Sequence, residues 1–401
     1  MVADAEFTSY YGRPILKGPV WKVPDVPTYL YAGGLAGSSA LMAAMAEATG
    51  RPGLRRVGRL AAAAAAAAGT GALVHDLGRP ERFLNMLRVV KPTSPLSVGS
   101  WILAPFGGLS AAAAASELTG RLPGLGRLAG LGSAALGAPL TTYTAVLLAN
   151  TAVPAWHEAH PELPFVFAGS ALASGGGVGL AVAPAAETGP ARRMLLVGAA
   201  VELGASQRME HRLGLVGEPY RTGRPGALLR AGRLLTAAAA VGAMAGACAG
   251  PLTRPDRPPG RLGPARRAGV AGRLGVARRA GAAVPGGLAG RGGVAGLLGV
   301  AGRAGMAGRA GGAGRGGVVG RLGVAGRRGG RGRADALVRS ARALDRLSGV
   351  LANAGALCTR FGIFTAGQVS AADPKYTVVP QRQRLTDRES AAPASEHPSR
   401  E

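Results

Sequence analysis

Residues 59–74 read RLAAAAAAAAGTGALV, residues 75–95 read HDLGRPERFLNMLRVVKPTSP, and residues 96–115 read LSVGSWILAPFGGLSAAAAA. The two outer stretches have almost no polar side chains, whereas the middle stretch is dense in charged, amide and proline residues. A helix in a soluble protein needs a polar face, and neither outer stretch has one on any side. The pattern therefore predicts two membrane-spanning helices joined by a polar loop at the membrane surface.

The overall composition favours the same class. Hydrophobic residues make up 47% of the 401 residues and charged residues only 17%, whereas soluble domains carry about 25% charged residues. A helix needs about 20 apolar residues to cross a bilayer, and stretches of roughly that kind recur along the chain. They lie at 29–50, 57–75, 96–118, 128–153, 163–183, 193–207, 227–250 and 345–366. The expected fold class is all-α, a polytopic membrane helix bundle with about eight transmembrane helices.

The spans divide the chain into five expected parts. Small-residue patterns inside them, such as GGLAGSSA and SGGGVG, predict that neighbouring helices approach closely. The parts are an N-terminal interfacial segment at 1–26, a membrane domain with spans one to seven at 27–250, a Gly/Arg-rich low-complexity insertion at 251–333, the last transmembrane helix at 334–367 and a polar C-terminal tail at 368–401.

The formal charge of +26 is concentrated in the Gly/Arg-rich insertion. Residues 251–333 contain seventeen arginines, no lysine and one acid, Asp256. Their composition resembles a disordered segment that binds RNA or anionic lipid, but they lack the aromatic residues that single-strand binders usually interleave. The other interpretation is a repeat expansion in GC-rich coding DNA or a locally wrong reading frame. The eight-span pattern stands without this segment, so we expect no nucleic-acid partner.

Ionisable groups mark two candidate sites. His75 and Asp76 lie at the predicted membrane boundary, where an ionisable pair could hold a proton. Glu202 falls near the middle of the short span 193–207, where a carboxylate is costly and usually functional; alternatively, the helix tilts and brings Glu202 close to an interface. The cations of the polar loop could bind lipid phosphates, the carboxylates of a partner protein or a quinone head group. They are Arg79, Arg82, Arg88 and Lys91.

Several long segments, in order, resemble the NrfD/PsrC family of polysulfide-reductase-type membrane subunits. The most specific is DLGRPERFLNMLRVVKPTSPLSVGSWIL at 76–103. The resemblance covers roughly residues 7–250 and 335–385, and departs where the Gly/Arg-rich insertion replaces a short loop. The other matching segments are YYGRPILKGPVWKVPDVPTYLYAGGLAGSSAL at 10–41, YTAVLLANTAVPAWHEAHPELPFVFAGSA at 143–171, GEPYRTGR at 217–224, CTRFGIFTAG at 358–367 and DPKYTVVPQRQR at 373–384.

The resemblance implies a membrane anchor subunit of a multi-subunit oxidoreductase. Such subunits pair with an iron–sulfur subunit of the four-cluster ferredoxin type, and often with a molybdopterin catalytic subunit. They bind quinone or menaquinone near the face that docks the iron–sulfur partner, and usually carry no haem. In this chain we expect no haem, iron–sulfur cluster or other metal, because there are two cysteines and the histidines lie at span ends or in loops.

The resemblance also suggests residue roles. Tyr143 matches the family's quinone-binding tyrosine of the fourth span, and Tyr31 occupies the first-span region, although the Asn/His pair of some members is absent. His75 and Asp76 complete the expected quinone site. Glu202 and Asp76 are the expected proton relay. The four loop cations are the expected docking surface.

The expected function is electron exchange between the quinone pool and an iron–sulfur partner, in a bacterial plasma membrane. The chain itself is expected to be a non-catalytic or quinone-reactive subunit, with membrane lipids around it. The alternative is a proton-translocating or transporter-like membrane module. Inverted repeats would favour a transporter, and the sequence contains no convincing internal repeat.

Overall fold

A computed structural model describes residues 15–79, 81–252 and 327–391. Within these residues the protein is helical, without a β-strand. The chain divides into one unit formed by Met1–Arg254 with Arg331–Glu401 and a second formed by Pro255–Gly330. The expected Gly/Arg-rich insertion therefore lies almost entirely outside the described residues.

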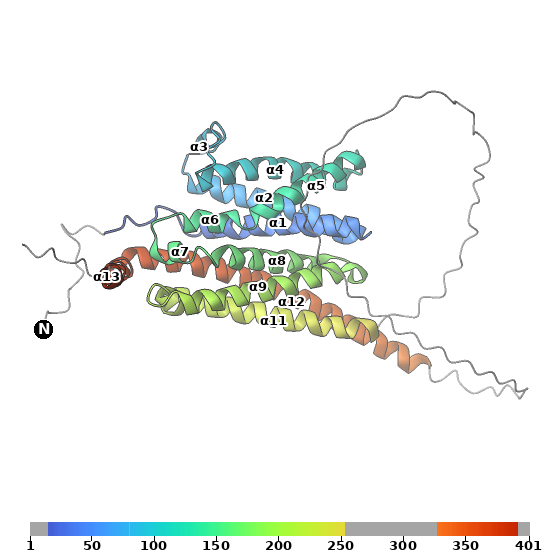
Figure 1. The fold of residues 1–401 in the computed structure, drawn as a ribbon. Coiled ribbons are helices and arrows are strands. Elements are labelled where there is room, and N and C mark those ends of the chain that lie inside the picture. Colours follow the sequence, from blue (N-terminus) through green and yellow to red (C-terminus); the bar gives the residue numbers. More distant parts are fainter. Residues whose placement is uncertain (1–14, 80, 253–326, 392–401) are drawn as a thin grey trace, which may run out of the picture. The chain divides into compact units, whose positions relative to one another are not determined.

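The long helices of the described residues lie side by side along the first unit (Figure 1). Their bounds are α1 Asp25–Ala48, α2 Pro52–Asp76, α3 Glu81–Asn85, α4 Pro95–Thr119, α5 Pro123–Leu140, α6 Tyr143–Ala149, α7 Pro154–Glu158, α8 Leu163–Val182, the 3-10 helix η2 Ala185–Glu187, α9 Gly189–Arg212, α10 Glu218–Arg221, α11 Gly223–Leu252, α12 Arg327–Ala372 and α13 Lys375–Ala391.

All eight expected spans correspond to helices, and six of these are long and apolar enough to cross a membrane. Among the described residues the six are Pro52–Asp76, Pro95–Thr119, Pro123–Ala149, Leu163–Val182, Gly223–Cys248 and Val338–Ala372. The first and sixth expected spans, α1 and α9, do not reach that apolarity, so the count of eight is not confirmed. Helix α1 contacts α2, α5, α8 and α9, and more than half of its residues are buried. A helix surrounded by protein can keep its Gly, Ser and Tyr residues.

Small residues allow the close helix contacts that the sequence predicted. Where α1 crosses α5, a Cβ atom built on Gly137 would lie only 2.7 Å from the carbonyl oxygen of Gly37. Any side chain at this point would push the two helices apart. Since lipid gives no hydrophobic drive for helix association, this close van der Waals packing is a main source of stability.

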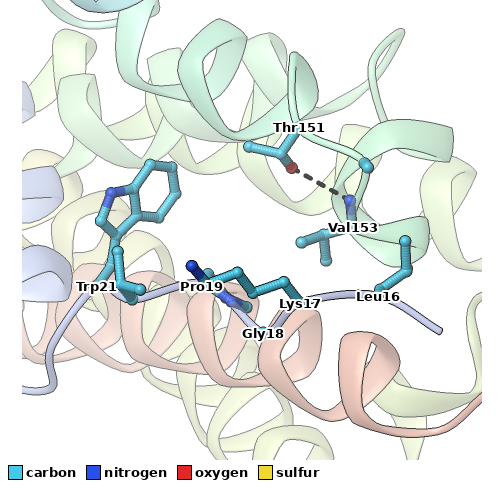
Figure 2. A pocket seen from close by; sticks show the side chains of 9 residues that line it. Leu16, Lys17, Gly18, Pro19, Trp21, Thr151 and Val153 are labelled. Atoms are coloured by element: carbon cyan, nitrogen blue, oxygen red, sulfur yellow. Dashed lines mark hydrogen bonds between the residues drawn. The ribbon is translucent and has the colours of Figure 1, made fainter. Parts of the chain in front are cut away.

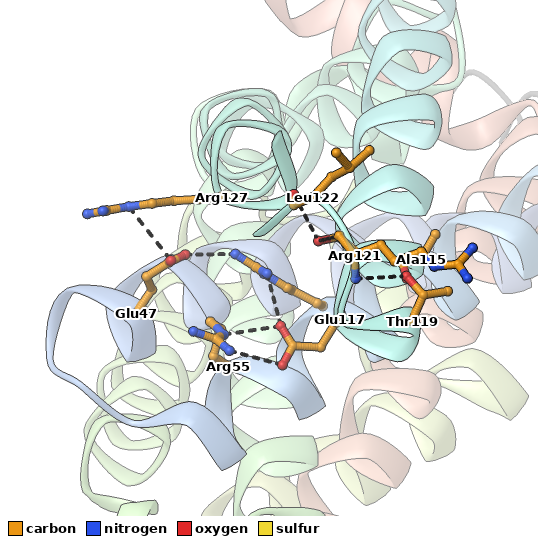
Figure 3. A network of polar contacts seen from close by, with 10 residues as sticks. Glu47, Arg55, Ala115, Glu117, Thr119, Arg121, Leu122 and Arg127 are labelled. Carbon is orange, nitrogen blue, oxygen red and sulfur yellow. Dashed lines mark hydrogen bonds and ion pairs between the residues drawn. The ribbon is translucent and has the colours of Figure 1, made fainter. Parts of the chain in front are cut away.

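The turn between α1 and α2 is shorter than the sequence suggested. We expected a basic loop before a span beginning at residue 57, but α2 already begins at Pro52. Arg59 is consequently helical and only 6% exposed. It forms ion pairs with Glu47 at 2.8 Å and Glu117 at 2.9 Å, and Arg55 also pairs with Glu117 at 3.1 Å (Figure 3). Three helices, α1, α2 and α4, are thereby joined at one end.

The described part of the N-terminal segment packs against α7. Residues 15–24 form no helix, and α1 begins at Asp25. Trp21 stacks on Trp156 of α7 with ring centroids 5.7 Å apart. Trp156 is fully buried and donates its Nε1–H to the carbonyl of Ile363 at 2.8 Å. This contact ties the N-terminal segment, α7 and α12 together.

The C-terminal part differs from the expected boundaries. Helix α12 runs over Arg327–Ala372, beyond the predicted span 334–367 at both ends. The expected polar tail at 368–401 contains a further helix, α13, at Lys375–Ala391. Tyr376 at its start is 4% exposed. Burial of the Tyr376 ring holds the start of the tail against the bundle.

Candidate functional site

His75 and Asp76 lie at the last turn of α2 and hold the start of the chain's first helix. The Nδ1 atom of His75 is 2.8 Å from Oδ2 of Asp25. The backbone N–H of Lys22 donates to Oδ1 of Asp76 at 2.9 Å. Asp76 forms no ion pair with Arg79 within the described chain. The ionisable pair is therefore His75 with Asp25, and Asp76 caps the N-terminal segment.

Tyr143 stands at the first residue of α6 and is 7% exposed. Its ring lies over Gly99 of α4; a Cβ atom built on Gly99 would be 2.7 Å from Tyr143 Cδ2. Its hydroxyl is buried and has no hydrogen-bond partner among the described residues. Buried polar atoms are nearly always paired, so an unpaired hydroxyl needs an explanation, and a ligand is one.

The surroundings of Tyr143 are apolar. Tyr143 belongs to the larger of the two buried hydrophobic clusters, together with Tyr29 and Leu30 of α1 and Leu103 and Phe106 of α4. Ala72 and Leu73 of α2 pack on the same cluster, one turn before His75. The tyrosine is thus positioned by α1, α2, α4 and α6 in a dry environment near the helix ends that carry His75. No hydrogen bond links Tyr143 to His75 or Asp76.

A cavity of about 350 Å³ lies where the N-terminal segment passes the turn between α6 and α7 (Figure 2). Residues 16–21 form one wall and Thr151, Ala152 and Val153 the other. A second cavity of about 320 Å³ shares Thr151 and Ala152 and extends to His157 and α13. The turn between α6 and α7 is thus accessible from two sides.

An ion pair fixes the neighbouring junction between α7 and α8. Arg212, at the end of α9, donates Nε to Glu162 Oε1 at 2.8 Å and Nη2 to Oε2 at 2.7 Å. These hydrogen bonds hold the pKa of Glu162 below its usual value. Glu162 is almost fully buried, so the pair sets the position of α8 against α9.

A second polar cluster lies deep between α8, α9, α11 and α12. Glu202 is 2% exposed and accepts hydrogen bonds from Thr359 Oγ1 at 2.8 Å and Thr236 Oγ1 at 3.3 Å. Helix α9 begins at Gly189, earlier than the expected span 193–207, and Glu202 is buried among its neighbouring helices. Arg360 interacts electrostatically with this carboxylate.

Arg360 is the main site residue that sequence reasoning missed. It is 1% exposed, and its Nη2 donates to the carbonyl of Phe167 at 2.8 Å while its guanidinium lies 3.7 Å from the centre of the Phe167 ring. Its Nε and Nη1 atoms have no hydrogen-bond partner among the described residues. An arginine inside the apolar span 345–366 was the available signal, because intramembrane charges are rare and usually functional.

Tyr31 belongs to this second cluster. Its hydroxyl donates to Asn353 Oδ1 at 2.7 Å, and Asn353 Nδ2 donates to the carbonyls of Gly349 and Ser174 at 2.8 and 3.3 Å. The structure therefore gives Tyr31 and Tyr143 different surroundings, although the sequence assigned both to one quinone site. Asn353 is a second residue that the sequence reading missed.

The predicted docking cations lie on the loop between α2 and α4 that includes α3. All four are exposed, and none forms an ion pair among the described residues. They are Arg79, Arg82, Arg88 and Lys91. Between them, Val89 and Val90 are also exposed, at 67% and 58%. The loop thus presents apolar side chains next to unpaired cations.

The comparisons with known proteins agree with this architecture. Residues 15–193 match the family model described as polysulphide reductase, NrfD. A search of curated proteins found no match. The match covers α1 to the start of α9, including Tyr143 and the loop between α2 and α4. The apolar helices of this chain make it a multi-pass membrane protein, as expected for the membrane subunit of an oxidoreductase. The family that the sequence resembles is therefore also the one whose model matches residues 15–193, the polysulphide reductase NrfD family.

Proposed function

We propose that this protein is the membrane anchor of an oxidoreductase complex in a bacterial plasma membrane, exchanging electrons between quinone or menaquinone and an iron–sulfur partner subunit. The observation that carries the proposal is the Tyr143 hydroxyl, which is buried, apolar in its surroundings and without a hydrogen-bond partner among the described residues. A quinone needs a hydrogen-bond donor at a carbonyl and apolar surroundings for its ring, and the Tyr143 hydroxyl supplies such a donor within an apolar cluster.

A bound quinone would supply two-electron chemistry coupled to two protons. Tyr143 would hold and orient a carbonyl oxygen by donating its hydroxyl. Gly99 would fix the direction of that hydroxyl, because the Tyr143 ring is packed against its backbone. Leu103 and Phe106 would exclude water from the same slot. These roles require only contacts that the helices already define.

Proton exchange with the solvent would fall to His75. Its side chain is 77% exposed while its partner Asp25 is 14% exposed. Imidazole is the side chain that most often transfers protons in proteins, and His75 is held in place by its contact with Asp25. Asp76, bound to the Lys22 N–H, would keep the N-terminal segment in place beside this pair.

The loop between α2 and α4 would dock the partner. Exposed apolar side chains beside cations are typical of interaction surfaces, and Val89 and Val90 lie between Arg88 and Lys91. We propose an iron–sulfur subunit of the four-cluster ferredoxin type as the direct partner, with a molybdopterin subunit as the catalytic component. The electron carriers would then reside in those subunits.

Replacing Tyr143 with phenylalanine should lower quinone-linked turnover of the intact complex about fivefold, since one hydrogen bond to the quinone contributes on the order of 1 kcal/mol. The ring, and hence the packing on Gly99, is kept. Turnover of the partner subunits with a soluble electron acceptor is the internal control and should not change. Tyr31→Phe is the matched variant: if it alone lowers turnover, the quinone site belongs to the second cluster and the assignment to Tyr143 is wrong.

A second candidate function, proton translocation, is favoured by Glu202. This carboxylate is buried in the bundle and bonded to two threonines. If it relays protons, Glu202→Gln should lower proton uptake by vesicles containing the complex about a hundredfold while quinone-linked electron transfer continues. Asp387→Asn, on the exposed side of α13, is the control. Unchanged proton uptake in Glu202→Gln would leave Glu202 with a structural role.

A further inference from the structure

An apolar groove of about 490 Å³ lies at the end of the bundle where α1 finishes and α9 begins. This end also carries the ion pairs of Arg59, so it is opposite to the one that holds His75. Met45, Ala48 and Thr49 of α1 form one wall, and Leu172 of α8 lies between the two walls. The wall from α9 consists of Pro190, Arg193, Met194 and Val197.

The groove follows from helix periodicity. The α9 residues are spaced i, i+3, i+4 and i+7, so they form one continuous face over about 10 Å of helix. Val197 on that face is 57% exposed, although it is apolar. An apolar face of this length, left open to the surroundings, matches part of an acyl chain rather than a compact polar ligand.

One guanidinium group lines the groove, and a second is hydrogen-bonded to the backbone of a lining residue. Arg193 lines it, is exposed, and has no ion-pair partner within the described parts of the chain. Arg51 donates Nη1 to the carbonyl of Thr49 at 3.2 Å, which places its charge beside the groove. No acidic residue lines the groove. By contrast, the adjacent Arg192 is neutralised by Asp345 at 2.6 Å. The groove thus combines an apolar floor with uncompensated positive charge.

We propose that this groove binds one anionic glycerophospholipid, with an acyl chain along α9 and the phosphate at Arg193 and Arg51. Arginine pairs strongly with phosphate oxygens. A quinone fits less well, because the Thr49 hydroxyl already donates to the Met45 carbonyl at 2.6 Å and the remaining polar lining is one cation. The site is independent of the electron-transfer proposal.

The test measures lipid retention by the purified intact complex with native mass spectrometry. The probes are phosphatidylglycerol and phosphatidylcholine with identical acyl chains, together with inorganic phosphate and menaquinone as competitors. Wild-type protein should retain one phosphatidylglycerol about tenfold more tightly than phosphatidylcholine, and Arg193→Glu should abolish this preference, since a charge-assisted contact to phosphate is lost. Val197→Trp, which fills the groove at an exposed position, should weaken both lipids.

Arg121→Glu is the matched control. Arg121 is exposed at the turn between α4 and α5, at the same end of the bundle but outside the groove. The Arg121→Glu variant should retain the wild-type preference for phosphatidylglycerol over phosphatidylcholine. An equal effect of Arg121→Glu and Arg193→Glu would mean diffuse attraction and would overturn the proposal. So would equal retention of the two lipids, competition by inorganic phosphate as effective as that by phosphatidylglycerol, or displacement of the lipid by menaquinone.

Discussion

Replacing Arg360 with leucine is expected to destabilise the helix bundle by about 1–3 kcal/mol, because a buried guanidinium that donates to a buried carbonyl is lost. Glu202, at 2% exposure, would also lose its favourable electrostatic interaction with the Arg360 guanidinium. The Phe167 carbonyl would also lose the hydrogen bond from Nη2. Unfolding in mixed micelles, followed by tryptophan fluorescence, measures the change.

The double variant separates the charge effect from packing. Combining Arg360→Leu with Glu202→Gln removes both charges, and a buried ion pair replaced by neutral groups is often close to neutral in stability. We therefore expect the double variant to recover most of the lost stability. Arg339→Leu, at an exposed position of the same helix, is the control for a lost arginine. If Glu202→Gln gives no recovery, the two side chains are not coupled.

Replacing Gly99 with alanine should displace Tyr143 and reduce both stability and quinone-linked turnover. The added Cβ atom would overlap the Tyr143 ring, and overpacking of this kind costs about 1–3 kcal/mol. The ring cannot move away freely, because Leu103 and Phe106 belong to the same buried cluster. Thermal unfolding of the purified complex, together with quinone-linked turnover, measures the two effects.

The same helix provides a matched control and a rescue. A Cβ atom built on Gly107 would meet no other atom within 4 Å. Gly107→Ala should therefore stabilise the protein slightly, because alanine favours a helix by roughly 1 kcal/mol over glycine. Tyr143→Leu removes the ring that the Cβ atom of Gly99→Ala would overlap. Adding this change should therefore restore the stability of Gly99→Ala without restoring turnover. If Gly99→Ala and Gly107→Ala behave alike, the contact between α4 and Tyr143 does not position the site.

The sequence by itself determined the membrane class, the helices and the family. Stretches such as residues 60–74 have no polar face, so a lipid-surrounded helix accommodates them. The resemblance of residues 76–103 led to the family that the family model also identifies. The predictions were wrong mainly at helix boundaries. At Pro52, for example, α2 begins after a tight turn where a loop was expected. The sequence also did not show whether α1 is a membrane span, because that depends on how far the neighbouring helices bury it.

The tertiary structure alone decided which polar groups meet. Spans rich in alanine and glycine are similar on all sides, so their sequence does not indicate which face of each helix turns inward. That rotation brings Arg360 to Glu202, 158 positions earlier in the chain, gives His75 the partner Asp25, and leaves the Tyr143 hydroxyl without one among the described residues. It is set by close packing of small residues such as Gly37 and Gly137 across helices, a property of the assembled bundle and not of any one segment.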